Sequence, residues 1–236
     1  MDIIRYRQRR EQIGHVNTRT ICTICLQPDF TCYCAHIRAF DPKIKFVILI
    51  HPIEARRRIA TGRMSHFCLK GSELIEGHEY SANPRVNELL ADPALQPFVL
   101  YPGRNSTNLT PLQPHERAAL FDSSKQTVIF VIDGTWNTAR KTMHLSENLK
   151  TVPRIGFTPP GPSAFRVRKQ PSEECYSTIE AIHHTIELLG EAHGFETGAR
   201  EHDNLLYAFN QMVKRRVELA QQPGRRQLRL LHSRFR

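Results

Sequence analysis

The sequence predicts an α/β fold, with a mostly parallel sheet that carries helices on both faces. From Lys43 onward, short apolar runs alternate with segments of helical periodicity, and this order is typical of parallel sheets. The clearest run, 127–132, is apolar after Thr127 and rich in β-branched residues, as expected of a strand buried on both faces. The 236 residues suffice for one substantial core, alone or with a small appendage.

The elements follow one another in a simple order. Strands are predicted at 44–50, 98–101, 127–132 and 152–157. Helices are expected at 86–90, at 116–121, after Trp136, at 179–189 and at 205–213. In the last two, apolar residues recur at steps of three and four, which is the spacing of an amphipathic helix that packs on the sheet.

Four of the six cysteines lie within thirteen positions, as Cys22-x-x-Cys25 and Cys32-x-Cys34. Zinc prefers four tetrahedral soft ligands, so this density predicts a structural zinc site with no open coordination position for chemistry. His36 is an alternative ligand to either member of the second pair, whose spacing is unusually tight. Four unrelated free thiols and a redox pair are the other interpretations, and no thioredoxin-like strand supports the latter.

The chain divides into three predicted parts. These are a basic segment with the zinc knuckle at 1–40, an α/β domain at 41–222 and a basic tail at 223–236. The formal net charge of +10 and separated arginine groups fit a phosphate backbone better than a small acidic metabolite. Charge alone is also compatible with a basic surface of no particular function.

The sequence shows no pattern typical of a membrane span or of a secretory signal. No apolar run approaches the ~20 residues of a transmembrane helix, and the start of the chain lacks the apolar core of a secretory signal. We therefore expect a cytoplasmic protein without a membrane partner. A mitochondrial transit segment is disfavoured because Asp2 and Glu11 lie within the Arg-rich start. In a reducing cytosol the six cysteines are not a disulfide framework.

Polar or conformationally special residues follow three of the predicted strands. In a parallel sheet these ends share one edge, where open α/β folds bind ligands beside helix N-termini. The segments are His51-Pro52-Ile53-Glu54 with Thr61-Gly62-Arg63, then Tyr101-Pro102, and Asp133-Gly134-Thr135-Trp136. A purely structural interpretation is also open, in which Asp133 caps the following helix and Trp136 is core. Likewise, Ser177 and Glu180 fit a helix N-cap and its capping box.

Together these motifs resemble the signature of the DTW-domain family, the tRNA-uridine aminocarboxypropyltransferases. The resemblance covers nearly the whole chain, in the family's order. It rests on the two cysteine pairs, His51-Pro52-x-Glu54, Thr61-Gly62-Arg63, Tyr101-Pro102, Asp133-Gly134-Thr135-Trp136, Arg166-Val167-Arg168 and Ser177-Thr178-x-Glu180-Ala181.

The resemblance implies a SPOUT-like, knotted fold that binds S-adenosylmethionine at the strand-end crevice. The implied reaction transfers the 3-amino-3-carboxypropyl group to N3 of a tRNA uridine, forming acp3U and releasing methylthioadenosine. The implied partner is tRNA, and the oligomeric state is open between a monomer and a homodimer. Two alternatives remain, a SPOUT-like tRNA methyltransferase and a non-catalytic zinc-knuckle RNA-binding protein.

Each motif residue acquires an expected role. Asp133, Thr135 and Trp136 are the expected catalytic residues. S-adenosylmethionine is expected to contact His51, Thr61, Gly62, Arg63, Tyr101, Pro102, Asp133, Gly134, Arg166, Ser177, Thr178 and Glu180. Asp133 is either the general base for uridine N3, a role for which burial would have to raise its pKa, or the anchor of the cofactor's ammonium group. Arg63 or Arg166 would bind its carboxylate, and zinc would be held by Cys22, Cys25, Cys32 and Cys34.

Overall fold

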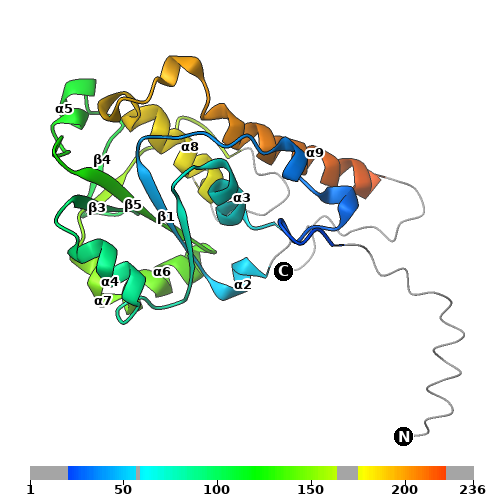
Figure 1. The fold of residues 1–236 in the computed structure, drawn as a ribbon, viewed down its shortest axis with the longest axis horizontal. Helices are drawn as coiled ribbons and strands as arrows, with labels where there is room; N and C mark the ends of the chain where they lie inside the picture. The colour runs from blue at the N-terminus through cyan, green and yellow to red at the C-terminus, as the bar shows by residue number, and fades with distance from the viewer. Residues whose placement is uncertain (1–20, 57–58, 164–174, 222–236) are drawn as a thin grey trace, which may run out of the picture.

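The computed structural model describes residues 21–56, 59–163 and 175–221 and confirms the α/β prediction (Figure 1). Its described strands form one sheet in the order β2-β1-β5-β3-β6-β4, and every neighbouring pair is parallel. The strands are β1 (Lys45–Ile50), β2 (Glu73–Glu76), β3 (Leu95–Leu100), β4 (Ser106–Asn108), β5 (Gln126–Asp133) and β6 (Arg154–Gly156).

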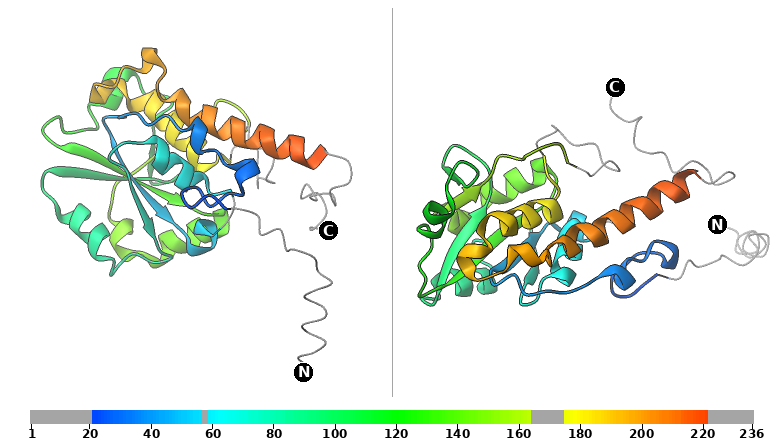
Figure 2. Two further views of the ribbon diagram at one scale, coloured as in Figure 1. Left: turned by 45° about the vertical axis from the view of Figure 1, so that its right-hand side comes forward. Right: turned by 90° about the horizontal axis from the view of Figure 1, so that it is seen from above.

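Helices cover the sheet on both faces, as predicted. They are α2 (Pro52–Ala55), α3 (Thr61–Cys68), α4 (Pro84–Ala91), α5 (Pro114–Ala118), α6 (Trp136–Leu145), α7 (Glu147–Lys150), α8 (Thr178–Leu189) and α9 (Asp203–Gln221). Short 3-10 turns are η1 (Asp29–Thr31), η2 (Cys34–His36), η3 (Glu191–His193) and η4 (Thr197–Ala199). Figures 1 and 2 show α4, α6 and α7 on one face of the sheet and α3, α8 and α9 on the other.

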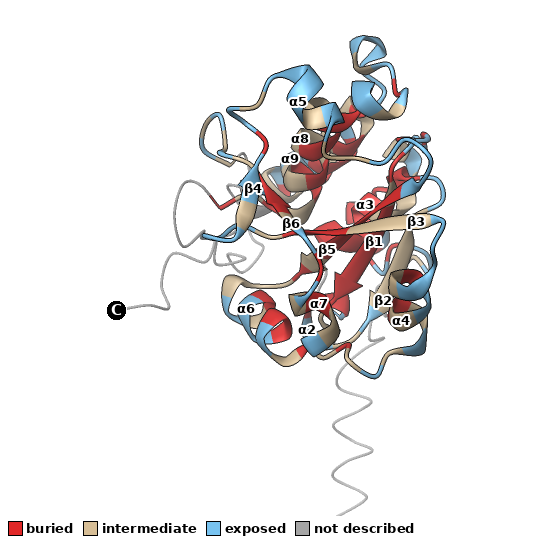
Figure 3. Cartoon of the chain, turned by 90° about the vertical axis from the view of Figure 1, so that its left-hand side faces the viewer, coloured by how far each residue is buried: buried red, intermediate tan, exposed pale blue. Residues whose placement is uncertain are grey.

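The central strand β5 contributes to the cores on both sides of the sheet. Phe130 packs with residues of β1, α4 and α7, whereas Ile129 packs with residues of α3, α8 and α9. Both side chains are fully buried, and Figure 3 shows the same burial along β1 and β5. Burial on both faces explains why β5 is apolar without alternation, since neither face of the strand meets water.

All four predicted strands are present, but two further strands were not predicted. Both are short edge strands: β2 is half-buried for most of its length and β4 is mostly exposed. The fourth predicted strand is shorter than expected, because only Arg154–Gly156 is hydrogen-bonded into the sheet. Helix α3 was also missed, because the residues it buries include Thr61, Arg63 and Ser65 and give no apolar stripe.

The register of the sheet sets the position of the strand ends. Ile50 of β1 lies opposite Asp133 of β5, so these two strands end at the same level. On the other side of β5, Leu100 of β3 lies opposite Val131. The polar segments after β1 and β5 therefore leave the sheet side by side.

The cysteine-rich segment lies against α9 rather than on the sheet. Arg215 of α9 donates from Nε to the carbonyl oxygen of Phe30 at 3.0 Å, and Arg216 donates to Gln27 Oε1 at 2.9 Å. Residues 1–20 of the predicted part at 1–40, and the whole predicted tail at 223–236, lie outside the described residues, and the knot implied by the resemblance stays a prediction. Among the described residues, every helix is too short or too polar to traverse a bilayer.

Candidate functional site

The candidate site is built around Asp133, the last residue of β5. The backbone N–H of His51, which directly follows β1, donates to the Asp133 carbonyl oxygen at 3.0 Å. This bond continues the pairing of the two strands by one residue. The Asp133 residue is only 4% exposed, so its carboxylate lies inside the strand-end edge and not on its surface.

Two helix N-termini meet the Asp133 carboxylate. Thr178, the first residue of α8, donates from Oγ1 to Asp133 Oδ1 at 2.5 Å. On α3, a Cβ added to Gly62 would lie 2.7 Å from both Cγ and Oδ2 of Asp133, so the helix backbone approaches the acid directly. Helix N-termini carry positive partial charge. Both helices therefore favour a negative charge at this position.

Arg63 lies next to Gly62 and is almost completely buried, at 7% exposure. Its Nη2 donates to the carbonyl oxygen of Ala55. Its Nη1 is buried and has no hydrogen-bond partner among the described residues. Leaving a buried charged donor unpaired is unfavourable, and a ligand carboxylate is the group that would satisfy it.

The capping interpretation of Ser177 and Glu180 is confirmed. The Glu180 carboxylate accepts from the Ser177 backbone N–H at 2.8 Å and from Ser177 Oγ at 2.5 Å, which forms a capping box. Ser163 Oγ donates to the same carboxylate at 2.8 Å. These contacts fix the start of α8 and thereby fix Thr178 against Asp133.

The cap of α6 is Thr135 and not Asp133. Thr135 Oγ1 accepts from the backbone N–H of Thr138 at 3.2 Å. A Cβ on Gly134 would lie 2.5 Å from Thr138 Oγ1, which explains the glycine between the acid and the cap. Trp136 is the half-buried first residue of the helix. The capping alternative for Asp133 is thus wrong, and its carboxylate faces α3 and α8 instead.

The other predicted site residues are distributed around this centre. His51 caps α2 by accepting from the Ile53 N–H at Nδ1 over 3.2 Å, and Thr61 is the buried first residue of α3. Tyr101 pairs with β6 through a bond from its N–H to the Ile155 carbonyl oxygen at 3.0 Å. Pro102 also lies on the β6 side, against Gly156. Arg166 lies outside the described residues.

The four predicted cysteine ligands converge. Cys22 Sγ lies 3.8 Å from Cys34 Sγ, and Cys25 Sγ lies 3.6 Å from Cys32 Sγ. All four sulfur atoms are within 4.8 Å of one another. A tetrahedral site with zinc–sulfur bonds of about 2.3 Å requires sulfur separations of about 3.8 Å. The residues therefore fit a four-cysteine zinc site without His36.

The Cys22 thiol lies in an environment that stabilises the thiolate, which is the form that binds a metal. Backbone hydrogen bonds from Cys25 and Ile24 lower the pKa of Cys22 to about 7. The turn between the first two cysteines therefore supplies both a position and a charge-stabilising environment. In the second pair, burial raises the pKa of Cys32 and of Cys34.

A second cluster of titratable groups joins α8 to the start of α9. His183 Nε2 lies 2.8 Å from Asp203 Oδ1, and the fully buried His202 bonds Glu187. Both carboxylates also accept from Arg200, at 2.7–3.0 Å. A cation therefore already occupies this cluster. The side chain of His183 is 12% exposed and joins the two helices.

A groove of about 370 Å³ lies between the cysteine-rich segment and α9. Its walls include Phe30, Tyr33 and His36 on one side and Lys214 and Arg215 on the other. The sequence does not reveal this groove, because its two walls are separated by more than 170 positions.

Comparison with known proteins gives a consistent result. The family model described as the DTW domain matches residues 19–217. Similar curated proteins are tRNA-uridine aminocarboxypropyltransferase 2 of Mus musculus (24% identity, 75% of this chain and 59% of the relative) and of Drosophila melanogaster (28%, 73% and 68%). The enzyme of the same name from Macaca fascicularis is 24% identical over 72% of this chain and 57% of the relative. The chain thus spans less than two thirds of the mouse and macaque proteins. No solved structure shows significant similarity to it.

Proposed function

This chain belongs to the DTW domain family, and we propose that it transfers the 3-amino-3-carboxypropyl group of S-adenosylmethionine to N3 of a tRNA uridine. The names of its relatives support this class of reaction. The observation that carries the proposal is the buried carboxylate of Asp133, which meets the N-termini of two helices, one of which also carries Arg63 with its unpaired buried guanidinium nitrogen.

Asp133 meets Gly62, and Arg63 is the next residue of the same helix, so the site combines a buried acid with a buried guanidinium, the two groups that match the ends of an amino acid. The Asp133 carboxylate would bind the ammonium group of the methionine moiety, and Arg63 Nη1 would bind its carboxylate. When bound, S-adenosylmethionine supplies a γ-carbon made electrophilic by the adjacent sulfonium. Holding both ends of the amino acid fixes the position of that carbon, and positioning of this kind lowers the barrier to transfer.

The transfer makes one bond and breaks one bond. Uridine N3 bonds to the γ-carbon, the electrons of the carbon–sulfur bond leave with methylthioadenosine, and the N3 proton passes to a base. Asp133 is enclosed at 4% exposure and bonded by Thr178. A carboxylate in this setting suits a small ligand better than a nucleotide that approaches from outside, so we assign Asp133 the anchoring role.

The by-product distinguishes the proposed reaction from its closest alternative. Purified protein, unmodified tRNA and S-adenosylmethionine should give methylthioadenosine and a tRNA nucleoside heavier by one aminocarboxypropyl group. S-adenosylhomocysteine with a methylated nucleoside would instead identify a methyltransferase. If cofactor binding is undetectable by calorimetry, the non-catalytic RNA-binding alternative is favoured.

The role of Asp133 can be tested separately. In the anchoring role, Asp133→Asn loses a charged contact worth roughly 1.5–3 kcal/mol, so the Kd for S-adenosylmethionine rises roughly 10- to 160-fold. The pH profile of single-turnover transfer at saturating cofactor keeps its shape. Normal cofactor affinity with loss of the acid limb of that profile would make Asp133 the base. Asp92→Asn is the matched control, because Asp92 is exposed and precedes β3, whereas Asp133 ends the parallel strand β5.

We also propose that the four thiolates of Cys22, Cys25, Cys32 and Cys34 hold a structural zinc ion. The sulfur separations support this, and four protein ligands leave no position for a substrate. The bound metal would fix a segment that contributes few apolar side chains to the core. The cytoplasmic location expected from the sequence stays a prediction.

A further inference from the structure

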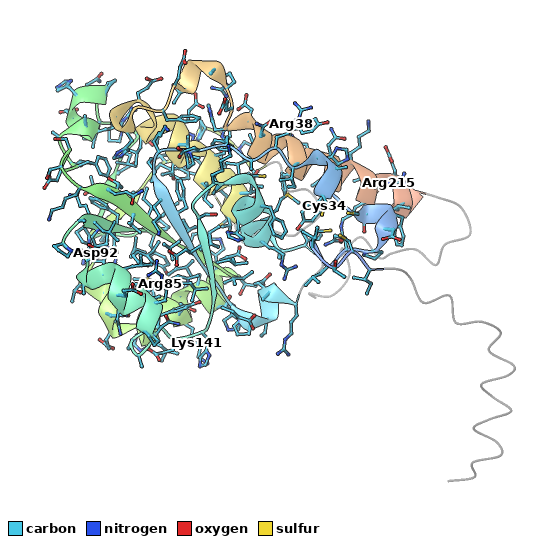
Figure 4. The ribbon with its side chains drawn as sticks, in the orientation of Figure 1. Cys34, Arg38, Arg85, Asp92, Lys141 and Arg215 are labelled. Carbon is cyan, nitrogen blue, oxygen red and sulfur yellow. The ribbon has the colours of Figure 1, made fainter. Side chains whose placement is uncertain are left out.

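The lining of the groove beside the cysteine-rich segment does not include Asp133, and the groove has no part in the proposed transfer. Its first wall is formed by η1, η2 and the residues between them, and its second by the last half of α9. In Figure 4, Cys34, Arg38 and Arg215 gather at this end of the molecule, whereas Arg85, Asp92 and Lys141 lie at the other.

One stripe of α9 faces the groove and its rim. Tyr207, Gln211, Lys214 and Glu218 recur at steps of four, three and four, so they share one side of the helix. Gln211, Lys214 and Glu218 line the groove. Tyr207 lies at the rim, where its ring meets the edge of His36 with ring centres 5.9 Å apart. The opposite side of α9 is buried in the core.

Lys214 of this stripe and Arg38 beside its Tyr207 are exposed cations that can meet a ligand. The exposed Lys214 has no hydrogen bond or ion pair to any described residue. Arg38 is exposed and lies over the Tyr207 ring, 5.4 Å from its centre. Arg215 instead donates to the Phe30 carbonyl oxygen and forms an ion pair with Glu218 at 3.2 Å. The negative charge of Glu218 is therefore already balanced by Arg215. Asp29 is the other acid of the lining.

We propose that this groove and its rim bind a single-stranded segment of RNA, an unpaired stretch of the tRNA substrate away from the modified uridine. Unpaired nucleotides are recognised by cations that follow the backbone and by aromatic or apolar groups that contact bases. The groove offers Lys214 and Arg38 with the rings of Tyr207 and His36 beside them.

The cysteine-rich segment also carries exposed apolar side chains. Ile21, Ile24 and Leu26 are 57%, 61% and 46% exposed, and they are among the few large apolar side chains left in solvent. Exposed apolar groups of this kind mark interaction sites. The net charge of +10 favours a polyanionic partner over a second copy of this chain. The identity of the RNA as tRNA rests on the proposed function.

The salt dependence of tRNA binding tests this inference. One phosphate contact on a single strand contributes about 0.7 to the slope of log Kd against log salt, which is about fourfold in Kd near 0.15 M. We expect Lys214→Ala to lower the slope by about 0.7 and weaken binding about fourfold. Arg38→Ala combined with Lys214→Ala should lower it by about 1.4, with binding about 14-fold weaker. Lys125→Ala, an exposed lysine directly before β5 and outside the groove lining, should leave both quantities unchanged.

The outcomes separate this inference from the proposed function. An unchanged slope and Kd in the double variant, with the fold intact by circular dichroism, would overturn the groove assignment. Concentration-dependent dimerisation that the double variant abolishes would assign the face to a second copy and would also overturn it. Cofactor affinity should be the same in all variants. A wild-type protein that binds tRNA through Lys214 but forms no aminocarboxypropyl product would leave the inference standing and refute the proposed transfer.

Discussion

Gly62→Ala is the substitution whose effect on the candidate site follows most directly from the structure. The added Cβ would lie 2.7 Å from Asp133 Cγ and Oδ2 and 2.9 Å from its Cβ. Ordinary van der Waals contact begins near 3.4 Å, so the overlap is about 0.7 Å. Asp133 is 4% exposed and bonded to Thr178, so its carboxylate cannot retreat without losing that bond or moving α3.

Two opposing terms set the cost in stability. Overpacking a filled site costs about 1–3 kcal/mol, while alanine is preferred over glycine in a helix by up to about 1 kcal/mol. The net loss in unfolding free energy should be about 0–2 kcal/mol, measured by urea denaturation. The effect on ligand binding should be larger, because a displacement of about 1 Å at a site can cost roughly 100-fold.

The assay is calorimetric titration of S-adenosylmethionine into folded protein. We expect Gly62→Ala to weaken binding by at least tenfold. Gly198→Ala is the control, because a Cβ there meets no atom within 4 Å and the backbone is not left-handed. If Gly62→Ala binds the cofactor as tightly as Gly198→Ala and is equally stable, Asp133 and α3 do not form the cofactor site.

Two further predictions concern the metal site and the sheet edge. Cys25→Ser, which removes a fully buried thiol of the predicted zinc site, should abolish the bound zinc measured by elemental analysis, whereas Thr23→Ala in the same turn should retain it. An equal zinc content in both would refute the four-cysteine site. Hydrogen bonding from Arg85 lowers the pKa of Glu73 from 4.5 to about 2. The Glu73 carboxylate therefore stabilises the fold fully above pH 4.5, and this stabilisation is lost as the pH falls toward 2. In a plot of unfolding free energy against pH, Glu73→Gln should therefore reduce the fall in stability at acid pH. Glu88→Gln, on the exposed side of Arg85, should not reduce it.

The sequence revealed the features that local chemistry determines. The strand at 127–132 was predictable because burial on both faces requires a continuous apolar run, which β5 has. The convergence of the four cysteines was predictable because they lie within thirteen positions. Strands β2 and β4 gave no such signal, since an edge strand of three or four residues buries little and needs few apolar side chains.

The contacts that build the site depend on tertiary packing. The bond between Thr178 and Asp133 joins residues 45 positions apart, and nothing in either local segment specifies its partner. Thr135 and Asp133 were equally good caps for α6 by residue type. The structure distinguishes the two residues by their contacts: the Thr135 side chain accepts from the first turn of α6, whereas the Asp133 carboxylate accepts from Thr178. The groove on α9 is likewise a product of packing between distant segments.

Nucleoside mass spectrometry of tRNA tests the central claim, which joins the reaction to the strand-end site. Cells that lack the gene would be complemented with the wild-type chain or with Asp133→Asn expressed at the same level. The account predicts that only the wild type restores a 3-(3-amino-3-carboxypropyl)uridine peak. Full restoration by Asp133→Asn, or a nucleoside profile unaffected by loss of the gene, would contradict it.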